Sequence, residues 1–177
     1  MDLNQYRKSP RANWINYDNG IFFITVCTKD KQHFFGTILR NEMHLSQIGK
    51  IADHYIQNAN KFNKEIEIPL YVIMPNHIHM IVSCNTDQEN INIVPHQRNP
   101  NPNMRTNGQM KRHVPTLSKY INSFKGSVTK QAKKINKNFQ WQYRFYDHRI
   151  RNSNDGNNIA TYIESNILNW EKDCFYT

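Results

Sequence analysis

Two histidines stand one residue apart in the segment PNHIHMIV, which covers residues 75–82. The rest of this segment is apolar and typical of a buried strand. Side chains of a strand alternate between its two faces, so His77 and His79 point to the same face. Their Cα atoms would lie about 6–7 Å apart, close enough for both imidazoles to bind one divalent cation. The alternative is a pair of hydrogen-bonded or exposed histidines on a half-solvated sheet.

Position 81 narrows the kinds of metal site that this pair can form. A histidine-triad hydrolase needs a third histidine there, and a metallo-β-lactamase-like HxHxD pattern needs an aspartate. The residue is Ile81, which excludes both patterns. The pair therefore needs its remaining ligand from another part of the chain.

Tyr162 and Asn166 lie in a predicted final helix, from about Asp155 to Asn169, whose apolar residues recur at helical spacing. Four positions separate the two residues, so the phenol and the amide share one face of the helix. The amide oxygen could complete a metal shell while the phenol lies beside the same ion. Ordinary packing is the alternative, because this pair is common on helices. Tyr143 and Tyr146 are second choices for a reactive tyrosine.

Another amphipathic helix is predicted from Thr116, with apolar residues on one side and lysines on the other. Lysines without interleaved acids repel one another unless anions screen them, and a phosphate backbone would serve. Three arginines follow the helix closely. Such contacts would position a nucleic acid without reading its sequence. The candidate DNA-binding residues are Lys119, Lys130, Lys133, Lys134, Lys137, Arg144, Arg149 and Arg151.

The composition favours a cytoplasmic protein with a polyanionic partner. The chain has a formal net charge of +9 in 177 residues, a length that fits one domain. Its three cysteines are far apart, which favours reduced thiols over a disulfide framework or a zinc ribbon. The sequence shows no apolar run long enough to cross a bilayer, and a location with the nucleoid would suit a DNA-binding protein.

The remaining elements indicate a single α+β domain with a largely antiparallel sheet. Strands are predicted at 21–27, 66–73 and 77–83, with a hairpin turning at 40–42 and a shorter strand within 142–151. Ser46 is expected to cap the first helix. A polar segment at about 84–115, rich in Asn, Gln, Pro and Arg, is predicted to be a flexible insertion within the single domain at 1–177.

Four segments in this order resemble the REP-associated tyrosine transposases and the wider IS200-like family of single-tyrosine HUH transposases, which act on single-stranded DNA. They are YDNGIFFITVCTKDKQHFFG, VIMPNHIHMIV, LSKYINSFKGSVTK, and the segment from FQWQYRFYDHRIRNSND to IATYIESNILNW. Together they extend over nearly the whole chain apart from the polar insertion. The HxH pair is common, whereas the ordered combination is specific.

The resemblance implies a ferredoxin-like HUH endonuclease core, with helices packed on a central antiparallel sheet. It makes His77 and His79 ligands of Mg²⁺ or Mn²⁺, Asn166 the amide ligand, and Tyr162 the nucleophile. The implied reaction cleaves and rejoins single-stranded or hairpin DNA, at palindromic repeats, through a 5′-phosphotyrosine. The chain departs from many relatives at Ile167, where they carry proline, so the helix is expected to continue.

Two other functions are compatible with the same residues. An inactive, domesticated module would hold hairpin nucleic acid without cutting it, and a metal-dependent phosphoesterase would use water instead of Tyr162. His148 is a weak candidate for an added ligand or a phosphate contact, and a structural histidine is its alternative. Relatives occur as monomers and as dimers, so a homodimer is compatible with the resemblance.

Overall fold

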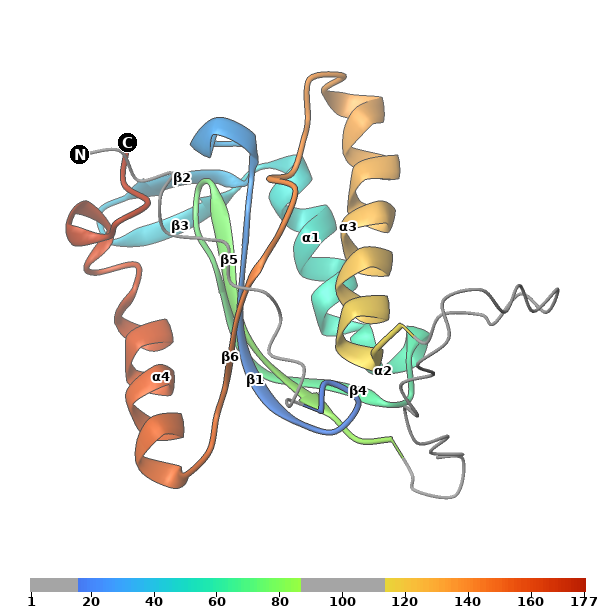
Figure 1. Ribbon diagram of the computed structural model, residues 1–177. Coiled ribbons are helices and arrows are strands. Elements are labelled where there is room, and N and C mark those ends of the chain that lie inside the picture. The colour runs from blue at the N-terminus through green and yellow to red at the C-terminus, as the bar shows by residue number, and fades with distance from the viewer. Residues whose placement is uncertain (1–15, 87–113) are drawn as a thin grey trace, which may run out of the picture.

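The structure, a computed structural model, describes residues 16–86 and 114–177 as an α+β arrangement (Figure 1). The sheet strands are β1 (Gly20–Cys27), β4 (Ile66–Ile73), β5 (His77–Cys84) and β6 (Tyr146–Arg149). The helices are α1 (Gln47–Gln57), α2 (Ala59–Phe62), α3 (Thr116–Ile135) and α4 (Ser153–Ser165). A separate hairpin joins β2 (Gly36–Leu39) to β3 (Glu42–Leu45), and 3₁₀ turns lie at η2 (Lys29–Lys31) and η4 (Trp170–Lys172).

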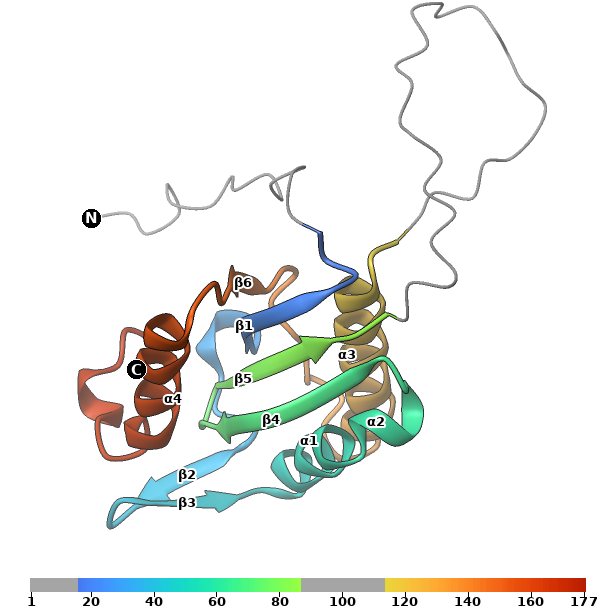
Figure 2. The same ribbon diagram turned by 90° about the horizontal axis from the view of Figure 1, so that it is seen from below.

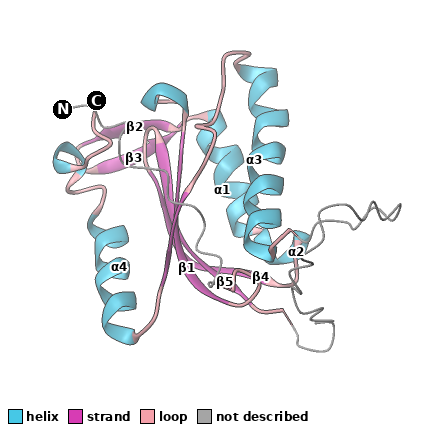
Figure 3. Cartoon of the chain, in the orientation of Figure 1, coloured by secondary structure: helices cyan, strands magenta, loops and turns pink. Residues whose placement is uncertain are grey.

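The main sheet has the strand order β4-β5-β1-β6, and every neighbouring pair is antiparallel. Figure 3 shows these strands passing between the helices. Helices α1 and α3 lie together on one face of the sheet, and α4 covers the other face (Figures 1 and 2). The predicted α+β domain with a central antiparallel sheet is therefore confirmed.

The alternation of β5 divides its side chains between two cores, as predicted. Ile78, Met80 and Val82 belong to the larger core that faces α1 and α3. Ile81 instead packs with Phe23 and Ile163 of α4 in a smaller core. Because side chains two positions apart share a face, His77 and His79 lie on the α4 side with Ile81.

Local signals in the sequence place the first helix and the hairpin correctly. Ser46 caps α1, and its Oγ accepts a hydrogen bond from the backbone N of Gly49 at 3.0 Å. Arg40 and Asn41 form the hairpin turn, and both have positive φ, as a type I′ turn requires.

The final helix is shorter than the sequence predicts, which corrects the expectation that it continues past Ile167. It ends at Ser165 with Asn166 as its C-cap, and the backbone N of Asn166 already bonds to the oxygen of Ile163. This bond reaches back three residues instead of the four of an α-helix. It begins a series of turns that leads into η4, where Trp170 is buried. The chain after α4 therefore bends away from the helix axis instead of extending it.

Most of the predicted polar insertion falls on residues 87–113, outside the described part of the chain. Within the described residues, no helix combines the length and the apolar character needed to cross a bilayer.

Candidate metal and nucleophile site

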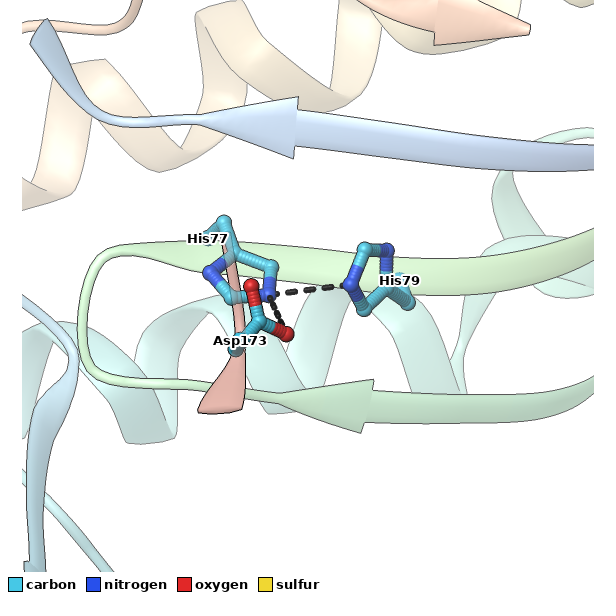
Figure 4. Close-up of side chains that lie close together, drawn as sticks. All are labelled: His77, His79 and Asp173. Carbon is cyan, nitrogen blue, oxygen red and sulfur yellow. Dashed lines mark hydrogen bonds and ion pairs between the residues drawn. The ribbon is translucent and has the colours of Figure 1, made fainter. Parts of the chain in front are cut away.

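The two histidines of β5 bring their Nε2 atoms within 3.0 Å of each other (Figure 4). Both side chains are buried, with exposed fractions of 0% for His77 and 2% for His79. Two imidazole nitrogens bound to one ion at about 2.1 Å and about 90° would also lie about 3.0 Å apart. The spacing of the pair therefore fits a shared cation.

Asn76 fixes the ring orientation of His77. Its Nδ2 donates to the backbone oxygens of Lys31 (3.2 Å) and Phe175 (2.9 Å), so its Oδ1 faces His77 Nδ1 at 2.8 Å. An amide oxygen only accepts, so His77 carries its proton on Nδ1. The Nε2 lone pair is then free to bind a cation.

Thr25 fixes the ring orientation of His79 in the same way. Residue Thr25 of β1 lies directly opposite His79 in the register, and its Oγ1 is 2.8 Å from His79 Nδ1. A hydroxyl can accept the Nδ1 proton, which leaves Nε2 of His79 available as a ligand.

Helix α4 places Tyr162 and Asn166 beside the histidines. The hydroxyl of Tyr162 lies 3.1 Å from His79 Nε2. Asn166 is 2% exposed, and its Nδ2 donates to Asp173 Oδ2 at 3.2 Å. Its Oδ1 is buried without a hydrogen-bond partner. A buried oxygen without a donor is costly, and a cation beside it would remove that cost.

Asp173 completes the cluster, although the sequence alone did not indicate it. Its Oδ2 lies 4.0 Å from His77 Nε2 and 3.3 Å from the Tyr162 hydroxyl, and the side chain is 3% exposed. One ligand atom from each of His77, His79 and Asp173 fits within 4.8 Å of the others. In Figure 4 the carboxylate points toward the two imidazoles.

The electrostatics of the cluster favour a cation. Burial is the main cause that holds the pKa of His77 well below its usual value, and burial lowers the pKa of His79 to about 4. Both imidazoles are therefore neutral near pH 7, and the contact of His77 with Asp173 is not an ion pair. The carboxylate accepts hydrogen bonds from neutral donors on Tyr162, Asn166 and the backbone of Phe175. Burial, with Asp173 as the next cause, raises the pKa of Tyr162 to about 12.

The donor set fits a divalent metal. Imidazole nitrogen suits transition metals, and carboxylate and amide oxygens suit Mn²⁺ and Mg²⁺. A cation at this point would neutralise the buried carboxylate and satisfy the orphaned Asn166 oxygen. It would also lower the pKa of the Tyr162 phenol, since a nearby positive charge favours the phenolate.

The shifted pKa of His79 predicts a pH dependence of stability in the metal-free protein. In the unfolded chain this histidine takes up a proton near pH 6.5, whereas the folded chain does so only near pH 4. The contribution of neutral His79 to the free energy of unfolding is therefore fully present above pH 6.5. About 3 kcal/mol of it is lost as the pH falls toward 4. Denaturant unfolding in the presence of EDTA should show this loss. The His79→Gln variant should lack the share of the loss that His79 contributes and keep the share that the lowered pKa of His77 adds over the same pH range. The His54→Gln variant, on the exposed side of α1, should retain both shares.

The predicted basic residues lie on different sides of the molecule. All five lysines of the predicted lysine stripe are exposed; they are Lys119, Lys130, Lys133, Lys134 and Lys137. The first four lie on α3, and Lys137 follows two residues after the end of that helix. Helix α3 covers the sheet face opposite α4 (Figure 1). The structure therefore does not bring the stripe to Tyr162. Arg144 and Arg151 are exposed on either side of β6, and Arg149 lies within that strand.

His148 does not join the metal group in this structure. Its Nε2 lies 3.0 Å from Asp155 Oδ2, so the ring links β6 to the first turn of α4. This geometry favours the structural alternative for His148.

Comparison with known proteins finds a relative that matches nearly the whole chain and a solved structure with the same fold. No protein-family model matches the chain. An uncharacterised protein of Haemophilus influenzae is 33% identical over 173 residues, which cover 97% of this chain and 93% of that protein.

Among solved structures, a REP-associated tyrosine transposase bound to a REP hairpin matches with a TM-score of 0.59 and 19% identity. The match covers 93% of this chain and 74% of the other. At this identity the likeness concerns the fold, and it agrees with the fold that the family resemblance implies. The chain therefore belongs to one family with the Haemophilus influenzae protein and has the fold of the REP-associated tyrosine transposase.

Proposed function

We propose that the protein is a metal-dependent single-strand DNA endonuclease and transposase that uses Tyr162 as its nucleophile. The observation that carries this proposal is the position of the Tyr162 hydroxyl, 3.1 Å from His79 and 3.3 Å from Asp173 in the cluster of possible metal ligands. The shared fold with a transposase bound to a REP hairpin supports hairpin DNA as the substrate. The net charge of +9 supports a polyanionic partner.

The proposed ligands are His77, His79 and Asn166, with Asp173 as an additional carboxylate ligand. Asn76 and Thr25 would hold the imidazoles in the required orientation. Mg²⁺ or Mn²⁺ bound there would supply charge stabilisation for the scissile phosphate and for the phenolate.

In the proposed reaction, the oxygen of Tyr162 forms a bond to phosphorus and the bond from phosphorus to the 3′-oxygen breaks. The phenol loses its proton and the departing 3′-oxygen gains one. The products are a 5′-phosphotyrosine and a free 3′-hydroxyl. Because one phosphoester replaces another, the reverse attack by a 3′-hydroxyl rejoins DNA without a nucleotide cofactor.

The positions of the basic residues suggest two DNA contacts instead of one continuous groove. Arg144 and Arg151 are exposed before and after β6, and we propose that they contact the DNA strand that reaches Tyr162. The lysines of α3 lie across the sheet, so they would contact a more distant part of a hairpin. Both sets remain proposed phosphate contacts.

The test is a labelling experiment on the full-length protein with single-stranded and hairpin oligonucleotides in Mn²⁺, Mg²⁺ or EDTA. A 5′-phosphotyrosine keeps the 3′ fragment on the protein, so a 3′ label should migrate with the denatured protein and a 5′ label should be released. Cleavage without a covalent adduct would contradict the proposal in favour of a water-using phosphoesterase. Binding without cleavage in either metal would contradict it in favour of an inactive module.

A further inference from the structure

Tyr146 of β6 lies in the same row of the sheet as His79. Thr25 of β1 is directly opposite His79 on one side and Tyr146 on the other. Directly opposed residues share a face, so Tyr146 and His79 both face the α4 side, about 10 Å apart across two strand spacings.

Phe23 connects Tyr146 to the proposed nucleophile. The ring of Phe23 stacks on His79 with centroids 5.3 Å apart and meets Tyr162 and Tyr146 edge-on at 6.1 and 6.3 Å. Phe23 itself is buried, whereas Tyr162 is 40% exposed and Tyr146 is 38% exposed. Two partly exposed phenol rings therefore flank one buried phenyl ring.

The surroundings of Tyr146 suit a negatively charged strand. β6 is at one edge of the described sheet, paired with β1 on its inner side. The exposed Arg144 and Arg151 lie two residues before and two residues after this strand. A partly exposed aromatic ring with arginines close by in the sequence is typical of surfaces that bind single-stranded nucleic acid through base stacking and phosphate contacts.

We infer that Tyr146 is a stacking platform for a base of single-stranded DNA beside the phosphate that Tyr162 attacks. The inference rests on the proposed function, and it adds a residue that binds the base instead of the phosphate. Stacking tolerates any base, because every base has a π-face. By holding one base against β6, Tyr146 would present the adjoining phosphate to the Tyr162 hydroxyl.

The experiment measures binding of the full-length protein to two fluorescein-labelled strands of equal length, a 20-nucleotide oligothymidylate and its abasic analogue. The strands have the same number of phosphates, but only one has bases. Tyr146→Ala should raise the dissociation constant for oligothymidylate by about 5- to 150-fold and leave that for the abasic strand nearly unchanged. Fluorescence anisotropy at several salt concentrations gives both values.

Matched variants separate stacking from a loss of packing. Tyr146→Phe keeps an aromatic face and should bind like the wild type. Tyr146→Leu keeps apolar bulk against Phe23 without a π-face and should bind as weakly as Tyr146→Ala. Tyr143→Ala removes a tyrosine that is 92% exposed just before β6 and should leave binding unchanged. The salt slope of Tyr146→Ala should equal that of the wild type, since the slope counts phosphate contacts.

The outcomes also distinguish this inference from the proposed function. Wild-type affinity in Tyr146→Ala, or equal losses on both strands, would overturn the stacking role while adduct formation by the wild type continued to support the nuclease. Failure of the wild type to bind either strand or to form any adduct would overturn both.

Discussion

The Tyr162→Phe variant is expected to form covalent protein–DNA adduct at less than about one-thousandth of the wild-type level. The change removes only the attacking oxygen. The phenylalanine ring can keep the edge-on contact with Phe23 that Tyr162 makes now. Affinity for the same DNA should therefore change little, because the proposed phosphate and base contacts are made by other residues. Denaturing gels measure the adduct, and anisotropy measures binding.

Tyr146→Phe is the matched control for this prediction. It makes the same chemical change on the other phenol that contacts Phe23. Its adduct level should equal that of the wild type, which would assign the reaction to the oxygen of Tyr162 and not to tyrosine hydroxyls in general. An adduct that survives Tyr162→Phe would reject Tyr162 as the nucleophile.

Much of this site could be predicted because each pair of site residues lies within one strand or one helix, and the geometry of that element fixes the directions of its side chains. A strand puts His77 and His79 on one face whatever surrounds it, and a helix does the same for Tyr162 and Asn166. The structure brings the two pairs together, since the Tyr162 hydroxyl contacts His79. That meeting depends on the order of strands, for which the family resemblance, not the residue spacing, supplied the expectation.

Asp173 could not be predicted in the same way. It lies eleven positions after Tyr162, and an unbroken helix would carry it far along the axis. It returns to the site because α4 ends at Ser165 and the chain turns through η4. The burial of Trp170 fixes this turn, and that burial is a property of tertiary packing.

The role of Asn76 and the position of the α3 lysines relative to Tyr162 could not be predicted from the sequence, for two other reasons. An asparagine before an HxH pair was a visible signal, but its role depends on backbone oxygens of Lys31 and Phe175, which are distant in the chain. The lysine stripe was assigned to the exposed side of its helix. Helical periodicity, however, does not say which face of the sheet a helix covers, and here α3 covers the face away from Tyr162.

Asp173→Asn is expected to lower the affinity of the metal-free protein for Mn²⁺ by at least about 100-fold. Changes to groups that merely orient metal ligands cost about 10- to 100-fold, so loss of a charged ligand should cost at least as much. Asparagine keeps the size of the side chain but removes the only charge among the proposed ligands. Electron paramagnetic resonance of free Mn²⁺ measures the affinity without any need for DNA cleavage.

Asp155→Asn is the matched control, because this aspartate pairs with His148 instead of the His77–His79 pair. It should bind Mn²⁺ like the wild type.

The double variant His77→Ala/His79→Ala should lose both Mn²⁺ binding and metal-stimulated cleavage. The Asn166→Ala variant removes a neutral ligand, so it should lose less affinity for Mn²⁺ than Asp173→Asn does. Wild-type Mn²⁺ affinity in a folded Asp173→Asn variant would mean that the ion is held without Asp173. The carboxylate would then act only as a hydrogen-bond acceptor for Tyr162 and Asn166, and the charge that attracts the ion would have to come from the phosphate of the DNA.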